Sequence, residues 1–286
     1  MILKMLKLIE CPRDAMQGLH DYIPAKIKAE YINLLLQVGF DTIDFGSFVS
    51  PKAIPQLRDT AEVLDMLDLD ASKSKLLAIV ANLRGVEEAI QHEQITYLGF
   101  PFSISETFQQ RNTNSSIEES LSTVAKLLNA CDRSKKKAVI YLSMAFGNPY
   151  GDDWSNEIAE YWTAELVKIG VETISLSDTT GVSTPGNIKY LFPHLQTQFP
   201  ELELGLHLHS TPQHIHEKVE AAWDSGCRRF DSALRGYGGC PMATDDLTGN
   251  IATEKIISFL EERRQPVSLN MDRWLEALRF STQIFG

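Results

Sequence analysis

The chain has 286 residues, of which 43% are hydrophobic and 23% are charged, an ordinary composition for a soluble globular protein. Its 38 acidic residues outnumber its 27 basic residues and give a formal net charge of −11 at pH 7. This balance argues against a nucleic-acid-binding protein, because phosphate recognition needs a basic surface, but it is compatible with a locally positive site for an anionic substrate.

The first element, MILKMLKLIE, is interrupted by Lys4 and Lys7 and is too short for the apolar core of a signal peptide, so we expect a buried strand there. No later run approaches the roughly 18 apolar residues of a membrane helix. The cysteines lie far apart without CxxC spacing, which disfavours a structural zinc site and favours a reduced, cytoplasmic chain.

Short apolar runs rich in β-forming residues alternate with longer helical patterns, as in a parallel sheet built from βα units. Eight runs predict strands: Leu6–Ile9, Thr42–Phe45, Leu76–Val80, Gln94–Leu98, Ala138–Leu142, Thr173–Leu176, Glu203–Leu208 and Arg229–Ser232. The stretches between them predict helices, such as Pro24–Val38, Ser116–Asn129, Asn156–Lys168 and Thr211–Asp224.

Residues typical of helix ends agree with this alternation. Gly39 and Gly170 stand where a left-handed cap ends a helix, and Ser115-Ser116 before Glu118-Glu119 predicts a capping box. No Pro-, Ser- or Gly-rich linker divides the chain. We therefore expect an α/β fold, a single domain over residues 1–286 whose (β/α)8 TIM barrel spans about residues 5–265. The last predicted helix, Met271–Phe280, is expected to pack across the barrel as a C-terminal appendage.

In such barrels the active site lies at the carboxyl ends of the strands. Arg13 and Asp14 follow the first strand in a predicted loop; at another place they would be a surface ion pair of little energetic value. His207 and His209 end the seventh strand, and alternate residues of a strand point the same way, so both imidazoles face one side. The alternative for them is a hydrogen-bonded pair of core histidines.

A glycine-rich loop is predicted after the eighth strand. Gly238 and Gly239 make this loop mobile, and Cys240 lies at its tip, where a packed loop thiol is the alternative interpretation. Asn250 precedes a helix that is predicted to start near Ile251, so by itself it would be interpreted as an N-cap.

Taken together, these side chains predict a metal site. The carboxylate of Asp14, the imidazoles of His207 and His209 and the amide oxygen of Asn250 form a mixed nitrogen and oxygen set. Such a set suits Mg²⁺ or Mn²⁺, with Zn²⁺ or Co²⁺ as alternatives. A divalent ion there would chelate a hydroxyl and a carbonyl or carboxylate of the substrate and act as a Lewis acid.

Several segments resemble the motifs of the 3-hydroxy-3-methylglutaryl-CoA (HMG-CoA) lyase family, which belongs to the DRE-TIM metallolyases. They are Pro12-Arg13-Asp14, the run GSFVSPK at residues 46–52, Asp178-Thr179-Thr180-Gly181-Val182 and Gly238-Gly239-Cys240-Pro241. The similarity continues in register from Lys7 to about Leu260. The combination of SFVSPK and GGCP is highly specific, whereas the HxH pair alone would not be.

The resemblance implies a retro-aldol cleavage of HMG-CoA into acetoacetate and acetyl-CoA, with Asp14, His207, His209 and Asn250 as metal ligands. Arg13 would stabilise the enolate oxygen that forms on the thioester. His207 would also help to remove the proton of the tertiary hydroxyl, and Cys240 would deliver a proton to the acetyl-CoA carbanion as a thiol. The acyl pocket would be lined by Asn112, Tyr141 and Ser143, with Asp44 at the position of an active-site Glu.

The departures from the family pattern concern mainly the acyl pocket. Asp44 replaces the family's Glu, Ser210 replaces the Asp that follows the histidines, and Glu10 lies one residue closer to Arg13 than the corresponding Glu. The alternatives are a lyase for another 3-hydroxyacyl-CoA or 2-hydroxy acid, and a condensing synthase of the citramalate or isopropylmalate type, although those synthases lack the GGCP loop. A barrel that only binds a ligand is disfavoured because all four ligands and Arg13 are present.

The resemblance further implies an acyl-CoA as the partner molecule, no organic cofactor, and no nucleic-acid or membrane partner. It leaves a homodimer open. The pathways that it implies are leucine degradation and ketone-body formation.

Overall fold

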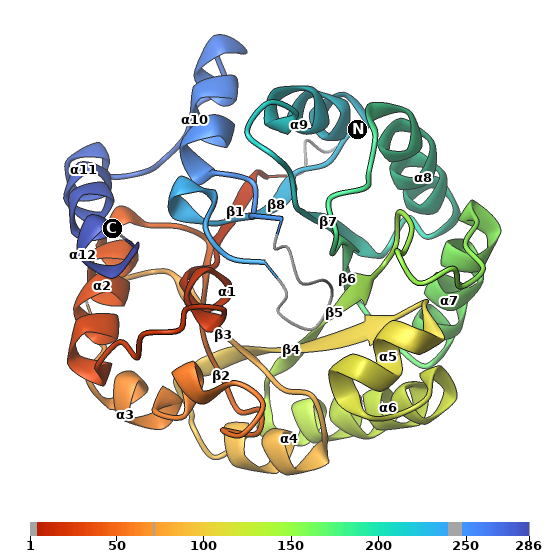
Figure 1. The fold of residues 1–286 in the computed structure, drawn as a ribbon, viewed down its shortest axis with the longest axis horizontal. Coiled ribbons are helices and arrows are strands. Elements are labelled where there is room, and N and C mark those ends of the chain that lie inside the picture. The colour runs from red at the N-terminus through yellow and green to blue at the C-terminus, as the bar shows by residue number, and fades with distance from the viewer. Residues whose placement is uncertain (1–4, 71, 240–247, 286) are drawn as a thin grey trace.

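Eight parallel strands follow one another around a closed barrel in chain order, and the last strand pairs with the first. The computed structural model describes residues 5–70, 72–239 and 248–285. The strands are β1 (Lys7–Glu10), β2 (Thr42–Ser47), β3 (Lys75–Ile79), β4 (Ile95–Ser103), β5 (Lys137–Ser143), β6 (Thr173–Asp178), β7 (Glu203–Leu208) and β8 (Arg229–Ser232). Figure 1 shows this ring of strands with the helices outside it. The predicted (β/α)8 barrel is confirmed.

Helices connect the strands, and most of them cover the outside of the barrel. They are α1 (Pro12–Gln17), α2 (Ala25–Val38), α3 (Thr60–Asp65), α4 (Leu83–Ala89), α5 (Glu106–Thr113), α6 (Ile117–Ser134), α7 (Asn156–Lys168), α8 (Pro185–Gln198), α9 (Ile215–Asp224), α10 (Thr253–Glu262), α11 (Met271–Phe280) and α12 (Thr282–Phe285). Two short 3-10 turns are η1 (Pro55–Leu57) and η2 (Leu234–Gly236).

The predicted helix ends are largely found. Gly39 ends α2 in the left-handed conformation, and Ser116 with Glu119 forms the capping box of α6. The predicted helix from Thr211 begins only at Ile215, because the residue before a proline avoids the helical conformation and Pro212 follows Thr211.

The C-terminal helices pack on the outside of the barrel. α11 lies against α2, as Figure 1 shows, and the ring of Trp274 meets that of Phe40 edge-on at 6.2 Å. The expected C-terminal helical appendage and its bounds are confirmed, but the helix packs on α2 at the outside of the barrel and not across a barrel end. The physical reason is that its buried residues, Trp274 and Ala277, extend the core of α2 rather than cover a barrel end.

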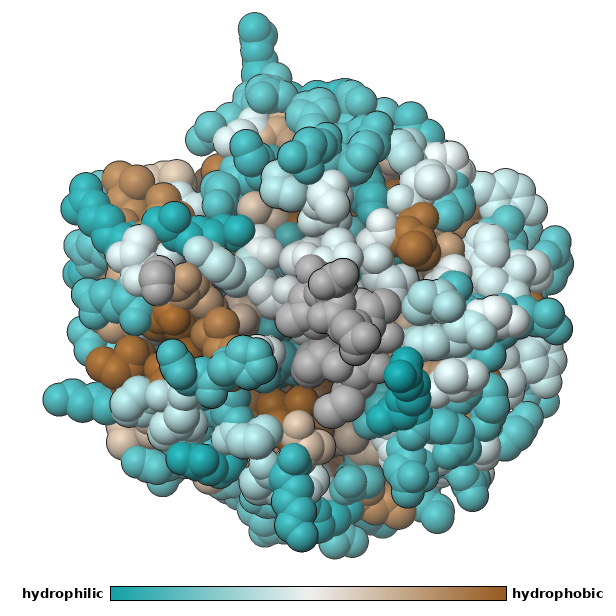
Figure 2. All heavy atoms as spheres, in the orientation of Figure 1, coloured by the Kyte–Doolittle hydropathy of each residue, from teal (hydrophilic) through white to brown (hydrophobic). Residues whose placement is uncertain are grey.

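The surface of the barrel face drawn in Figure 2 is largely hydrophilic, with smaller apolar patches toward the centre and over the elements at the left. None of the helices within the described residues is both long enough and apolar enough to cross a membrane.

Candidate metal and substrate site

The predicted site residues that the structure describes come together at the carboxyl end of the barrel. Arg13 and Asp14 lie in α1 rather than in the predicted loop, because Pro12 at the first helical position favours a short helix directly after β1. His207 belongs to β7 and His209 follows it, and their Nε2 atoms are 3.2 Å apart. Ligand atoms of the buried residues Asp14, His207 and His209 all lie within 4.8 Å of one another.

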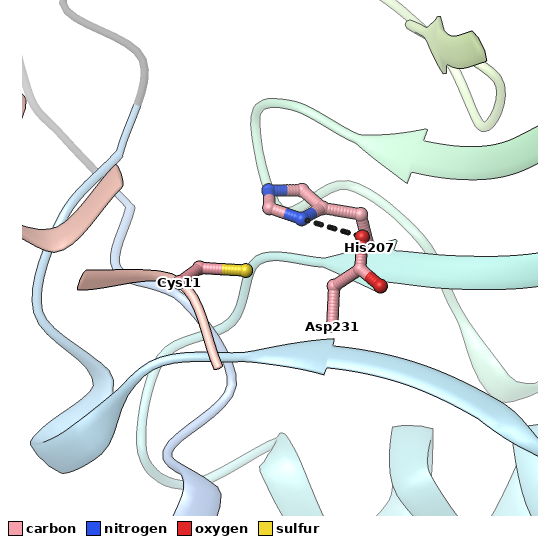
Figure 3. Close-up of side chains that lie close together, drawn as sticks. All are labelled: Cys11, His207 and Asp231. Carbon is pink, nitrogen blue, oxygen red and sulfur yellow. Dashed lines mark ion pairs between the residues drawn. The ribbon is translucent and has the colours of Figure 1, made fainter. Parts of the chain in front are cut away.

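The partners of the two histidines favour tautomers that leave both Nε2 atoms free. His209 Nδ1 lies 2.7 Å from the carbonyl oxygen of Thr248, which can only accept, so Nδ1 donates and a neutral ring keeps its lone pair on Nε2. His207 Nδ1 faces Asp231 Oδ2 at 3.4 Å, as Figure 3 shows, which favours the same tautomer. Two lone pairs at this distance repel unless a cation lies between them. The arrangement fits a metal better than a neutral pair of core histidines.

The surrounding charges also favour one cation at this place. Burial lowers the pKa of His207, but Asp231 and Asp14 outweigh burial and bring that pKa above its ordinary value. Burial and the neighbouring His207 lower the pKa of His209. Burial tends to raise the pKa of Asp14, but Arg13 and the two histidines reverse the effect and hold it at about 2. The anionic Asp14 beside the two rings therefore makes this place favourable for a cation, and a divalent ion fits it.

Asn250, the fourth predicted ligand, lies beside Asp14. Its Nδ2 lies 2.6 Å from Asp14 Oδ2 and 2.8 Å from the carbonyl oxygen of Tyr237. Because both of these atoms are acceptors, the NH₂ group must face them, and the amide orientation follows from the chemistry. Asn250 Oδ1 is buried and has no hydrogen-bond partner among the described residues. A buried amide oxygen without a donor is costly unless a cation or water satisfies it, so this atom also fits a metal site.

Asn250 is not an N-cap, because α10 begins at Thr253 and Ala252 is its capping residue. The described chain that leads to the predicted loop passes directly over the cluster. Gly238 has a φ of +102°, and a Cβ atom there would lie 2.6 Å from Asn250 Nδ2, so this position requires glycine. Cys240, the predicted proton donor, lies outside the described residues.

Arg13 joins the cluster to Asp44. Its Nε donates to both Asp44 oxygens at 3.2 and 3.1 Å, and its Nη1 donates to Asp14 Oδ1 at 2.8 Å and to Gln17 Oε1 at 3.0 Å. Burial lowers the pKa of Arg13, but Asp44 and Asp14 outweigh that effect and raise it above its ordinary value. Burial raises the pKa of Asp44 to about 6 although Arg13 opposes it.

Asp44 was predicted as a substrate-binding residue, but its side chain has 0% exposure and does not line the cavity. It lies behind Arg13 and orients the guanidinium. The prediction is corrected in this respect, because the carboxylate of Asp44 is bonded to Arg13, whereas Ser47 at the end of the same strand reaches the cavity.

A cavity of about 360 Å³ opens above the cluster. Its lining includes the predicted metal and catalytic residues Arg13, Asp14, His207 and His209 together with the predicted pocket residues Asn112, Tyr141 and Ser143. Tyr141 meets the ring of His207 edge-on at 5.6 Å, and its buried hydroxyl has no partner among the described residues. Burial raises the pKa of Tyr141, so the phenol keeps its proton and can serve as a donor. The structure therefore brings Asn112, Tyr141 and Ser143 into the same cavity as three of the predicted metal ligands.

Sequence reasoning missed Asp231 and the position of Cys11. Figure 3 shows that both side chains point toward His207 from β8 and from the end of β1. Asp231 pairs in register with His207 on the neighbouring strand. An alignment of the two predicted strands could therefore have placed its carboxylate beside the imidazole. Burial and then nearby carboxylates raise the pKa of Cys11 well above its ordinary value, so this thiol is neutral and a poor nucleophile or metal ligand.

Comparison with known proteins identifies the family. The family model described as HMGL-like matches residues 7–280. The chain belongs to this family. It is 31% identical over 278 residues to the hydroxymethylglutaryl-CoA lyase YngG of Bacillus subtilis, covering 96% of this chain and 91% of that protein. Against the human mitochondrial hydroxymethylglutaryl-CoA lyase the identity is 32% over 283 residues, with coverage of 98% and 86%.

Solved structures of the HMGL-like family agree. An HMG-CoA lyase from Acinetobacter baumannii in complex with coenzyme A and 3-methylmalate has a TM-score of 0.91 and 31% identity, covering 99% of this chain and 92% of that one. The Bacillus subtilis HMG-CoA lyase also has a TM-score of 0.91, with coverage of 98% and 93%. The resemblance inferred from the sequence motifs is confirmed.

Proposed function

We propose that this protein is a divalent-metal-dependent lyase that cleaves HMG-CoA into acetoacetate and acetyl-CoA. The observation that carries the proposal is the convergence of the two Nε2 atoms and the Asp14 carboxylate beside a buried arginine. The amide of Asn250 bonds to Asp14, and its oxygen has no hydrogen-bond partner among the described residues. Mg²⁺ and Mn²⁺ suit this set best, with Zn²⁺ and Co²⁺ as alternatives. The metal would lower the pKa of the substrate hydroxyl and polarise the oxygen atom beside it.

Arg13 and Asp44 supply the electrostatic part of the mechanism. Two carboxylates fix the guanidinium, which lines the cavity, so it needs no reorganisation when negative charge develops on the thioester oxygen. His207 lines the cavity, and its Nδ1 faces Asp231. We propose it as a metal ligand and, as the resemblance implies, as the group that helps to take the proton lost by the tertiary hydroxyl, with Asp231 stabilising the positive charge that the ring would then carry.

Cys240 is proposed as the acid that protonates the carbanion of acetyl-CoA, and for this it must arrive as a thiol. Gly238 and Gly239, which lead to it, lie close to the cluster: Gln17 contacts both Asp14 and the Gly239 carbonyl, at 2.7 and 3.4 Å. A cytoplasmic location and a homodimer belong to the same proposal, and gel filtration tests the second.

Purified protein with Mg²⁺ or Mn²⁺ should release acetyl-CoA and acetoacetate from HMG-CoA faster than it cleaves other 3-hydroxyacyl-CoA thioesters. Chromatography of the acyl-CoA products measures this. Preference for another thioester would favour the related lyase that Asp44 and Ser210 leave open. Release of free CoA from acetyl-CoA and a 2-oxo acid, without cleavage of HMG-CoA, would contradict the lyase and indicate a condensing synthase.

The contact between Asp231 and His207 gives a prediction about metal affinity. Asp231→Asn keeps the shape but replaces a carboxylate by an amide that can donate to Nδ1, which moves the ring hydrogen to Nε2. We expect the affinity for Mn²⁺, measured by titration, to fall about 10–100-fold. Asp59→Asn is a matched control, because Asp59 is also buried but pairs with Lys28 away from the site. Equal affinities in the two variants would contradict this role of Asp231.

A further inference from the structure

Glu10 is a buried carboxyl group that the proposed mechanism does not use. It is 0% exposed and pairs in register with Ser232 of β8. Its Oε1 accepts from the backbone N–H of Leu234 at 2.7 Å, and its Oε2 forms a hydrogen bond of 2.6 Å with the hydroxyl of Thr253. No cationic side chain pairs with Glu10 in the part of the chain that the structure describes. Both of its contacts are therefore hydrogen bonds to two separate chain segments.

The first of these segments carries the backbone carbonyl that bonds to Asn250, and the second contains Asn250 itself. Leu234 begins η2, which Tyr237 follows, and Thr253 begins α10 shortly after Asn250. The backbone joins the segments as well, since Ala233 N donates to the carbonyl of Ile251 and Thr253 N donates to that of Ala233, each at 3.1 Å. Their approach is so close that a Cβ atom on Gly249 would lie 2.2 Å from the Gly236 carbonyl oxygen.

The ligand amide depends on this junction from both sides. Asn250 is part of the second segment, and the carbonyl of Tyr237 that accepts from its Nδ2 is part of the first. A shift of one segment against the other would break this hydrogen bond and turn Oδ1 away from its present direction. Glu10 bonds to both segments through one rigid carboxyl group.

We propose that Glu10 is a positioning residue, which holds together the two segments that flank Asn250 and so places the amide oxygen of Asn250 for the metal. This inference rests on the proposed metal site. The neighbouring Cys11 lies beside His207, whereas Glu10 points to the other side of the chain. Glu10 therefore acts only through the backbone N–H of Leu234 and the hydroxyl of Thr253.

The chemistry of Glu10 supplies a conservative variant. Burial raises its pKa to about 8, although its hydrogen bonds with Thr253 and Leu234 oppose this, and Glu254 raises it further. Glu10 is thus mainly a neutral acid at pH 7, and a glutamine can replace it: the amide oxygen accepts from Leu234 N, and the NH₂ group donates to the Thr253 hydroxyl.

The inference is tested by Mn²⁺ binding, followed by electron paramagnetic resonance at pH 7, and by amide hydrogen exchange. Glu10→Ala should weaken Mn²⁺ binding about tenfold, the lower end of the range for groups that orient ligands, and should speed exchange in residues 232–239 and 248–253. Glu10→Gln should restore both to within about twofold of the wild type. Thr253→Val should weaken binding about threefold, whereas Thr163→Val, a buried hydroxyl bonded only within α7, should change nothing.

The outcomes separate the inference from the proposed function. Wild-type affinity and exchange in Glu10→Ala, or in Thr253→Val if the alanine variant does not fold, would overturn the role of Glu10. So would a glutamine variant as weak as alanine, because it would show that charge and not hydrogen bonding matters. Absence of Mn²⁺ binding in the wild type would contradict the metal site instead, and hydrogen exchange would then decide whether Glu10 joins the segments.

A pH measurement adds an independent readout. The pKa of Glu10 rises from 4.5 to about 8 on folding, so its contribution to stability is complete below pH 4.5 and is lost as the pH rises toward 8. Glu10→Gln removes this dependence, and its free energy of unfolding relative to the wild type should rise across that window. Glu254 of α10 and Tyr31 of α2, the titratable groups that act on Glu10 or respond to it, are unchanged in the comparison.

Discussion

Chelation of the divalent ion with EDTA is expected to abolish activity, and added Mg²⁺ or Mn²⁺ should restore it. The reason is electrostatic: without the ion, the substrate hydroxyl keeps a pKa far above neutrality, and its alkoxide does not form. His209→Ala should have the same effect because it removes one of the two convergent Nε2 atoms. Product formation from HMG-CoA and Mn²⁺ binding measure the two consequences separately.

The matched control for His209 is His214→Ala. His214 is exposed and pairs with Glu217 on the surface, so its loss should leave metal binding and turnover unchanged. Full activity of the wild type in excess EDTA would remove the metallolyase interpretation.

Arg13→Lys should lower kcat by about 10³-fold, the upper end of the range for loss of one preorganised oxyanion donor. Lysine keeps the charge, but a single ammonium cannot span Asp44 on one side and Asp14 with Gln17 on the other as the planar guanidinium does. The positive charge would therefore no longer be held in place at the cavity wall. Steady-state kinetics with HMG-CoA give kcat and KM separately.

Arg228→Lys is the control for this substitution, because the Arg228 guanidinium stacks on Trp223 and bonds to backbone carbonyls outside the cavity. It should leave kcat unchanged. A rise in KM at constant kcat in Arg13→Lys would mean that Arg13 binds the substrate and does not stabilise the transition state.

Local sequence patterns were sufficient for the barrel and for much of the site. Strand and helix periods depend on neighbouring residues, so β7 was predicted over Glu203–Leu208 as found, and the side on which its histidines lie followed from alternation. Helix caps are local as well, which is why Ser116 with Glu119 could be read directly. The motifs around Arg13 and Cys240 indicated the family without any knowledge of the fold.

Only the tertiary structure decided how these residues act together. Contacts between strands and loops that are distant in sequence decide three features of the site. They place Asp231 against His207, they place Asp44 behind Arg13, and they use both hydrogens of the Asn250 amide. Ionisation also depends on the tertiary structure. The pKa values of Asp44 and Glu10 are raised mainly because burial removes water from these carboxyl groups, and no local sequence pattern records burial of this kind. The sequence by itself determined the barrel and its family and predicted the ligand set, because those are carried by short-range patterns. The orientation and charge of each ligand were decided by the closed barrel, because it alone brings β1, β7, β8 and the segment before α10 into contact.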